Sequence, residues 1–251
     1  MRTDILELQA FYASPLGICA RDFIVARALD AWPSLKGLRL AAFGYGEPYL
    51  EAIDAAAGPE RALALDPDGQ GVASWDSVAG DPATGRARNR AALVAEHHWP
   101  LPDASIDRLL IVHGLEETAK PLRLMREAWR VLTNDGRLIV VSAHRRGLWS
   151  LIETTPFANG RPYFVGQLER LFQESMFRPE RRASALYFPP TRGAGTLRWA
   201  RALERAGARL WPWAGGVVML EAAKDLSQPV AARARAPRLI GAPAPTRAAV
   251  I

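Results

Sequence analysis

The segment that decides the fold covers residues 99–142 and reads WPLPDASIDRLLIVHGLEETAKPLRLMREAWRVLTNDGRLIVVS. It contains the apolar stretch IDRLLIVH (106–113) and the start of a second, RLIVVSAH (137–144), and each predicts a strand buried on both faces. Between them lies one helical stripe, made of Leu122, Met125, Trp129 and Leu132, and TNDG predicts the turn into the second strand. The order strand, helix, strand predicts one unit of a doubly wound α/β sheet.

The same alternation extends on both sides of this segment. Further strands are predicted at 38–43, 61–66 and 91–97, with one or two helices in 2–33 and another at 48–57. Downstream, helices are predicted at 166–177 and 196–206, and RLWPWAGGVVMLEAAK (209–224) predicts two strands joined at Gly215 and Gly216. Such a sheet binds its ligands at the carboxyl ends of the strands.

Composition indicates an ordinary globular chain of 251 residues, 49% hydrophobic and 23% charged, long enough for one or two domains. The net charge is +6, but residues 226–251 hold four arginines and no acid, so residues 1–225 carry only +2. We therefore expect one domain over 1–225 and an Ala/Pro/Arg-rich flexible tail over 226–251. The tail lacks aromatic residues for base stacking, which argues against a specific nucleic-acid partner.

Neither a membrane nor an exported location is expected. No run approaches the roughly 18 apolar residues that a spanning helix needs. The start, MRTDILELQAFY, carries two acids early and lacks the pattern of a signal peptide. The sequence thus predicts a cytoplasmic protein.

The block at 99–142 resembles the class I S-adenosylmethionine-dependent methyltransferases, especially the small-molecule branch called type 11. In that family a loop LPFPDxSFD, a strand, an LEH-like turn, a helix ending RVLxPGG and a strand follow in this order. The resemblance extends loosely over residues 10–225, and its details are similar to an alphaproteobacterial subgroup with a degenerate glycine loop. It implies a Rossmann-like seven-stranded sheet with a final antiparallel hairpin strand, S-adenosyl-L-methionine as cofactor, and a variable acceptor or partner region at 150–195.

The family's first loop, DxGxGxG, corresponds to LRLAAFGYGEPYL at residues 38–50. The resemblance assigns three cofactor-binding positions there: Gly44, Tyr45 and Gly46. Ala42 stands where the family has an acid, and Pro48, which has no amide hydrogen, stands where it has the third glycine. Glu47 is a candidate substitute for the missing acid. The loop is therefore expected to keep its shape and to lose polar partners for the methionine end of the cofactor.

Further cofactor contacts follow from the resemblance. Asp66, in ALDPD, matches the acid that accepts hydrogen bonds from the ribose hydroxyls, although such a residue is also typical of a turn before proline. Glu96 is the candidate near the adenine, with His97 beside it, and Tyr12 is expected to cover the cofactor. Because His97 and His98 point in opposite directions on a strand, no metal site is expected.

His113 ends the predicted strand at 106–113, beside the place of the methyl group and the acceptor in this family. It is the candidate catalytic base, and a structural histidine at a strand end is the equal alternative. Arg161 and Tyr163 are candidates for acceptor binding. Glu116 and Glu117 are expected to open the next helix, where carboxylates suit the positive end of its dipole.

Two functions remain open at this stage. The first is an active methyltransferase with a small-molecule acceptor. The second is a methyltransferase-like protein that has lost catalysis and binds a protein partner, a metabolic hydrolase of the glyoxalase II type being one candidate. An exposed apolar surface around five aromatic residues would favour the second. These residues are Trp149, Phe157, Tyr163, Phe164 and Phe177.

Overall fold

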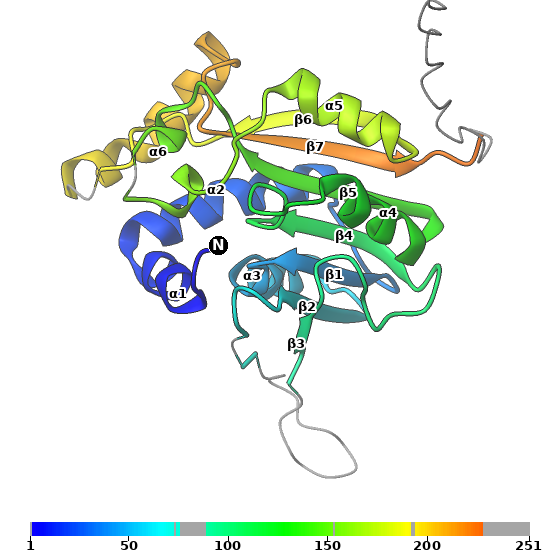
Figure 1. Cartoon of the computed structure of the whole chain (residues 1–251). Coiled ribbons are helices and arrows are strands. Elements are labelled where there is room, and N and C mark those ends of the chain that lie inside the picture. Colours follow the sequence, from blue (N-terminus) through cyan, green and yellow to red (C-terminus); the bar gives the residue numbers. More distant parts are fainter. Residues whose placement is uncertain (1, 73, 76–88, 153, 192–193, 228–251) are drawn as a thin grey trace, which may run out of the picture.

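A computed structural model describes residues 2–72, 74–75, 89–152, 154–191 and 194–227. Its centre is one sheet of seven strands in the order β3-β2-β1-β4-β5-β7-β6 (Figure 1). The strands are β1 Arg39–Gly44, β2 Arg61–Pro67, β3 Ala91–Val94, β4 Ile106–Val112, β5 Leu132–Ala143, β6 Phe177–Ala185 and β7 Val217–Lys224. The predicted Rossmann-like, doubly wound sheet is confirmed.

Strand direction defines where a ligand belongs. Strands β3, β2, β1, β4 and β5 pair in parallel, whereas β7 runs antiparallel to both β5 and β6. From β1 the chain moves to β2 and β3 on one side, and then returns to place β4 on the other side of β1. The carboxyl ends of β1 and β4 therefore form the topological switch point, where open α/β sheets place their ligands.

Helices cover both faces of the sheet (Figure 1). They are α1 Ile5–Ala13, α2 Pro15–Ala31, α3 Glu47–Ala57, α4 Pro121–Val131, α5 Val165–Glu174 and α6 Ala194–Leu210, with short 3-10 turns at Leu148–Ser150 and Pro156–Ala158. Asp4 caps α1 by accepting from the Leu6 amide, and Ser14 caps α2 in the same way through Gly17. Gly58 ends α3 in the left-handed conformation.

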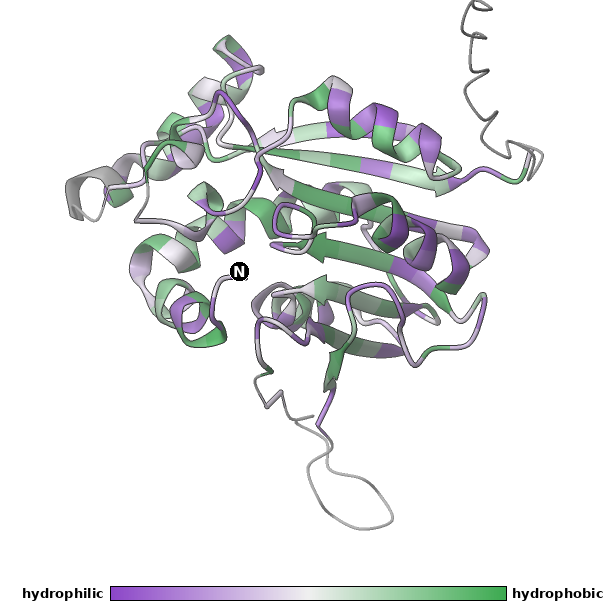
Figure 2. Cartoon of the chain, in the orientation of Figure 1, coloured by the Kyte–Doolittle hydropathy of each residue, from purple (hydrophilic) through white to green (hydrophobic). Residues whose placement is uncertain are grey.

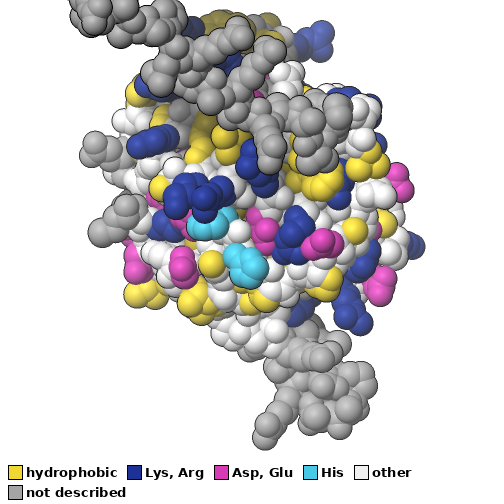
Figure 3. All heavy atoms as spheres, turned by 45° about the vertical axis from the view of Figure 1, so that its right-hand side comes forward, with side chains coloured by type: hydrophobic (Ala, Val, Ile, Leu, Met, Phe, Trp, Pro, Cys, Tyr) yellow, Lys and Arg dark blue, Asp and Glu magenta, His cyan; other side chains and the backbone are white. Residues whose placement is uncertain are grey.

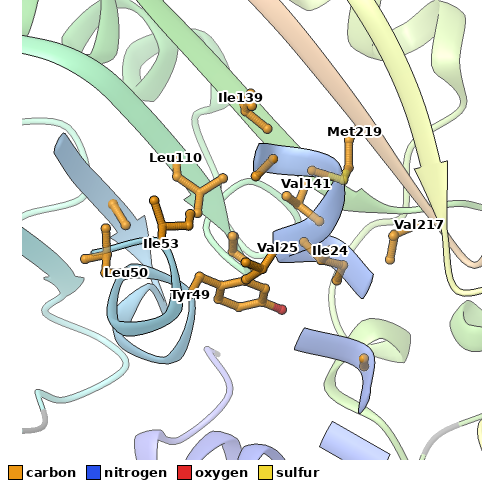
Figure 4. Close-up of a cluster of buried hydrophobic side chains, with 14 of the residues drawn as sticks. Ile24, Val25, Tyr49, Leu50, Ile53, Leu110, Ile139, Val141, Val217 and Met219 are labelled. Carbon is orange, nitrogen blue, oxygen red and sulfur yellow. The ribbon is translucent and has the colours of Figure 1, made fainter. Parts of the chain in front are cut away.

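The buried side chains form one apolar cluster on each face of the sheet. One joins α1, α2 and α3 to the sheet, and the other joins α4 and α5 to the opposite face. Figure 2 shows the strands as largely hydrophobic, as expected for a sheet covered on both faces. Figure 4 shows Tyr49 of α3 within the first cluster, near Ile24 and Val25 of α2 and Leu110 of β4.

Three sequence predictions about this framework were wrong. The partner of the last strand is β6, because residues 209 and 210 end α6 and 211–216 form the turn before β7. Strand β3 stops at Val94 rather than 97. The buried stripe of α4 runs through Leu124, Met125, Ala128 and Val131, whereas Leu122 is exposed, so the helix is rotated by about one residue position relative to the predicted stripe.

Charges are mixed over the face shown in Figure 3, where basic and acidic side chains alternate with apolar ones. Within the described residues, no helix is both long and apolar enough to cross a bilayer. Most of the predicted tail, residues 228–251, lies outside the described part of the chain.

Candidate functional site

The glycine loop after β1 keeps its tight turn through close backbone packing. Gly44 has a φ of +100°, and a Cβ there would lie 2.0 Å from the Val112 carbonyl oxygen at the end of β4. The next amide, that of Tyr45, donates to the same oxygen at 2.9 Å. Glycine is therefore required at position 44, since any side chain would break the junction of β1 and β4.

The two departures from the family's loop are accommodated. A Cβ on Gly46 would lie 2.3 Å from the Ala42 Cβ, so the glycine allows α3 to begin directly above that methyl group. Pro48 lies in the first turn of α3, where a missing amide hydrogen costs little. The loop therefore keeps its shape despite the missing acid at 42.

Two carboxyl groups meet beside this loop. Asp66, the last but one residue of β2, is fully buried, and Glu47, the first residue of α3, is nearly so. The Glu47 carboxyl interacts with that of Asp66, and burial raises the Glu47 pKa above its ordinary value. A ligand offering hydroxyl donors would find two acceptor groups here.

The side chain of Arg2 lies in the crevice at the switch point. Its guanidinium forms an ion pair with Glu96 at 2.7 Å and donates to the carbonyl oxygens of His113 and Gly114 at 3.5 and 3.2 Å. It also faces the Phe43 ring, 5.9 Å from the centroid, and its side chain is only 4% exposed. Arg2 thus links the end of β3 to the end of β4, and no sequence pattern pointed to it.

Residues 2–4, which we call the N-terminal arm, are held in place by hydrogen bonds to neighbouring residues. Thr3 donates to Glu117 through its amide at 3.0 Å and through its hydroxyl, and Asn159 donates to the Thr3 hydroxyl at 3.0 Å. The Ile5 amide donates to the Gln70 carbonyl, and the Gln70 side-chain amide donates to the Gly44 carbonyl. The arm is therefore anchored from the glycine loop to the segment after β5.

A chain of three buried polar side chains fills the rest of the crevice. The Tyr12 hydroxyl lies 2.5 Å from the Tyr49 hydroxyl and 2.7 Å from His113 Nε2. Burial lowers the pKa of His113 to about 3, so the ring is neutral at neutral pH. A consistent arrangement has Tyr49 donating to Tyr12 and Tyr12 donating to Nε2, with the proton of His113 on Nδ1.

The predicted site residues are distributed as follows. Gly44, Tyr45, Gly46, Asp66, Glu96, Tyr12 and His113 all lie around the crevice at the carboxyl ends of β1 to β4. His97 is exposed, at the turn after β3. Arg161 is exposed and binds through its amide to the Glu116 carbonyl, while Tyr163 is half-buried beside the end of β5, where burial raises its pKa to about 12.

Glu116 and Glu117 do not open a helix, because α4 starts only at Pro121. Glu116 is instead buried, where it accepts from the Ala143 amide at 3.0 Å, and burial raises its pKa. Glu117 holds the N-terminal arm through Thr3. The expectation that these two carboxylates lie at the start of a helix was wrong, because the segment between β4 and α4 is longer than the sequence indicated.

The apolar surface that would favour a binding protein is not formed by the five aromatic residues around Trp149. Trp149, Phe157 and Phe177 are buried and Tyr163 is half-buried, so Phe164, at 36%, is the exposed member of the five. The described tryptophans that are exposed lie elsewhere, at Trp199, Trp211 and Trp213.

Two hollows flank the filled crevice. One, of about 330 Å³, lies between α1 and the segment 154–159, with Phe11, Ser14 and Thr155 among its lining residues. The other, of about 280 Å³, is bordered by Tyr12, Tyr45 and Glu47 and reaches Trp75. In the described part of the chain, no three His, Cys, Asp or Glu side chains gather as a metal site would need.

Comparison with known proteins agrees with this architecture. Residues 41–140 match the family model described as a methyltransferase domain. No curated protein sequence matches the chain significantly. The matched segment spans β1 to β5 and contains the glycine loop, Asp66, Glu96 and His113.

Solved structures share the fold at low sequence identity. A protein of Thermotoga maritima described as a "SAM-dependent methyltransferase, possible histamine N-methyltransferase" is 17% identical, with a TM-score of 0.55 over 88% of this chain and 96% of the other. A SAM-dependent methyltransferase of Archaeoglobus fulgidus is 15% identical, with a TM-score of 0.53 over 81% and 94%. A structure of the Haloferax volcanii Trm112 methyltransferase activator in complex with a protein described as a "putative methyltransferase" is 14% identical in sequence, with a TM-score of 0.53 over 80% of this chain and 88% of the other.

The fold is thus that of the solved S-adenosylmethionine-dependent methyltransferases, and residues 41–140 match a methyltransferase-domain model. The polar groups of the crevice fit the cofactor in part. Asp66 and Glu47 offer acceptors for hydroxyl groups, and Glu96 and the His113 and Gly114 carbonyls offer acceptors for N–H groups. Glu96 and the carbonyl groups of His113 and Gly114 hold Arg2 in this structure, so a nucleoside would reach them only after the N-terminal arm moves.

Proposed function

We propose that this protein is an S-adenosylmethionine-dependent methyltransferase that acts on a small-molecule acceptor. The observation that carries the proposal is the fully buried Asp66 at the end of β2, beside the glycine loop and next to the switch point of the sheet. A carboxylate at this position offers two acceptor oxygens, and the two hydroxyl groups of a ribose would donate to them.

The cofactor, when bound, supplies a methyl group on a positively charged sulfur. In our proposal Asp66 and Glu47 accept its ribose hydroxyls, and Glu96 accepts an N–H of its base. Transfer is a displacement in line with the acceptor atom, so holding two reactants in position supplies much of the acceleration. The chain's own contribution is therefore binding, orientation and exclusion of water.

For His113 we propose a positioning role. An imidazole with a pKa of about 3 is a weak base at neutral pH, and its Nε2 is already hydrogen-bonded to the Tyr12 hydroxyl. By fixing the Tyr12 hydroxyl, His113 would shape the wall that faces the reacting groups. The acceptor would occupy the hollow between α1 and residues 154–159, which is lined by Phe11 and by polar atoms of Ser14 and Thr155. Contacts from Arg161 and Tyr163 to the acceptor stay predictions.

Cofactor entry requires the N-terminal arm to leave the crevice. Arg2 occupies the acceptors of Glu96, His113 and Gly114 that a nucleoside base would use. The arm therefore acts in this proposal as an internal competitor, and the apparent affinity for the cofactor depends on how often it is released.

One observation favours a second candidate, a non-catalytic binding protein. The crevice is filled by the chain's own Arg2 and Tyr12, and Ala42 replaces the family's acid. A protein that never releases the arm would have no use for the cofactor. The glyoxalase II-type hydrolase stays a prediction for the partner in that case.

Calorimetric titration with S-adenosylmethionine and S-adenosylhomocysteine separates the two candidates. The methyltransferase proposal expects saturable binding, weakened at least about tenfold by Asp66→Ala, since a hydrogen-bonded carboxylate contributes about 1.5–3 kcal/mol. Asp68→Ala is the matched control, because Asp68 lies two residues further on and is exposed. Absence of binding by the wild-type chain and by a variant lacking the Arg2 side chain would reject the proposal and favour the second candidate.

A further inference from the structure

Helix α6 is fixed to the body by a narrow stripe of residues. Ala200, Glu204 and Gly207 are buried, and the Glu204 carboxylate accepts from the amides of Leu186 and Tyr187 at 3.0 and 2.7 Å. A Cβ on Gly207 would lie 2.4 Å from the Tyr187 Cβ, so the helix lies close against this segment. Figure 1 shows α6 at the periphery of the molecule, and its neighbours are α2 and β6. Its orientation is therefore fixed, and most of its circumference faces outward.

The outward part of α6 is divided into a basic and an apolar sector. At about 100° of rotation per residue, the arginines fall within about 80° of the helix circumference. They are Arg198, Arg201, Arg205 and Arg209, all exposed. The apolar sector holds Trp199, Leu203 and Leu210 within about 40°, and Ala202 and Ala206 lie in the interval of about 80° between these residues and the arginines. The side chains of Trp199, Leu203 and Leu210 are 64%, 39% and 61% exposed.

The turn that follows α6 extends this surface. Trp211 and Trp213 are 53% and 66% exposed. The chain has eight tryptophans, and the three that are exposed, all within the described residues, lie between positions 199 and 213. Residues 194–214 contain one acid, Glu204, which is buried and bound by backbone amides. The solvent-facing side of a helix normally carries polar residues, so the exposed tryptophans and leucines here indicate a surface that binds a partner.

We propose that α6 and the turn after it bind the surface of an anionic phospholipid membrane. Tryptophan prefers the boundary between lipid and water, and arginine binds phosphate while its stem lies along apolar surface. A helix with an apolar and a basic sector lies in the plane of such a boundary. The exposed tryptophans alone would also suit base stacking, but Leu203 and Leu210 add apolar side chains that bases do not use and that the lipid boundary does, which favours lipid over RNA.

This proposal departs from the expectation that no membrane is involved. That expectation rested on the absence of a spanning segment and on a body charge of only +2. The overall count conceals the local charge, because α6 gathers four exposed arginines without an exposed acid among its residues with described side chains. The contact would be peripheral, at the lipid surface, and it does not depend on the proposed methyltransferase activity.

Vesicle sedimentation with the full chain tests the proposal. The wild-type protein is expected to bind vesicles of mixed phosphatidylglycerol and phosphatidylcholine, and to bind at least about tenfold more weakly to pure phosphatidylcholine or at high salt. The variants Trp199→Ser/Leu210→Ser and Arg201→Glu/Arg205→Glu should each lose binding by about tenfold or more. Binding should also shift the tryptophan fluorescence to shorter wavelength, and Trp199→Ser/Leu210→Ser should reduce that shift.

Matched controls come from exposed residues away from α6. Leu151→Ser, next to the 3-10 turn at Leu148–Ser150, and Arg123→Glu/Arg126→Glu, on α4, make the same kinds of substitution at exposed positions and should leave vesicle binding unchanged. Failure of the wild-type protein to bind the mixed vesicles would overturn the proposal, as would equal losses in the control variants. Binding of a polyuridylate oligonucleotide without vesicle binding would assign the surface to RNA. Self-association abolished by Trp199→Ser, again without vesicle binding, would assign it to a second copy.

Discussion

Replacing Arg2 with alanine should strengthen cofactor binding if the N-terminal arm competes with the cofactor. The side chain is 4% exposed and makes a charged contact to Glu96 and two hydrogen bonds to carbonyls, of which one is long at 3.5 Å. A hydrogen bond that involves a charged group contributes about 1.5–3 kcal/mol, so we assign the closed arm about 2 kcal/mol from Arg2. Losing that contribution raises the open population up to about 30-fold.

The apparent dissociation constant for S-adenosylhomocysteine should fall by the same factor, up to about 30-fold, because affinity is reduced by the fraction of molecules that are competent to bind. Calorimetric titration measures it, and thermal melting shows whether the variant remains folded. Arg126→Ala is the matched control, an exposed arginine on α4 far from the crevice in sequence. Weaker binding in Arg2→Ala would refute the reasoning, since Arg2 would then belong to the cofactor site itself.

Three further outcomes follow from the geometry. Gly44→Ala should destabilise the protein by at least about 3 kcal/mol in urea unfolding, because its Cβ meets the Val112 carbonyl, whereas Gly37→Ala, with open space around a φ of +73°, should cost about 1 kcal/mol. Glu204→Ala should cost about 2 kcal/mol by thermal or urea unfolding, since two buried amides lose their acceptor, and no loss would contradict the assigned bonds. Between pH 7 and 5 the wild type should lose about 2 kcal/mol of stability relative to His113→Asn, because the unfolded histidine takes up a proton below about pH 6.5 while the buried ring, with a pKa of about 3, does not. Parallel pH profiles of the two proteins would contradict this, and asparagine suits the positive φ of 53° at this position.

The sequence predicted secondary structure correctly where one hydrophobic pattern continues over several residues. Strands β1, β2, β4 and β5 are dense apolar runs, and their order alone predicts the parallel sheet. Strand β6 was missed because FRPERRASA carries five charged or proline positions, which is tolerable at the sheet edge that it occupies. Residues 209 and 210 were expected in a strand but end α6, because propensity over a few residues does not decide between the two.

The candidate site was predictable only where a side chain belongs to a strand end. Asp66 lies at the end of β2, and Glu96 and His113 follow β3 and β4, so topology alone brings them together. Arg2 and Gln70 lie in segments without periodicity, and their positions depend on tertiary contacts that no spacing encodes. The exposed tryptophans were missed for a related reason, since helical spacing shows a stripe without showing whether it faces the core.

The charge of the crevice offers a sharper test of the competitor role than affinity alone. Arg2 is paired with Glu96, and Glu117 binds the neighbouring Thr3, so removal of the Arg2 side chain leaves these acids without that buried cation. S-adenosylmethionine carries a positive sulfonium, whereas S-adenosylhomocysteine carries none. If Arg2 only anchors the arm, its loss should increase the affinity for both ligands by the same factor. If the charge of Arg2 also offsets these acids, Arg2→Ala should increase the affinity for S-adenosylmethionine more than that for S-adenosylhomocysteine. Arg2→Lys keeps the charge and loses the forked hydrogen bonds, so it should remove this difference between the two ligands.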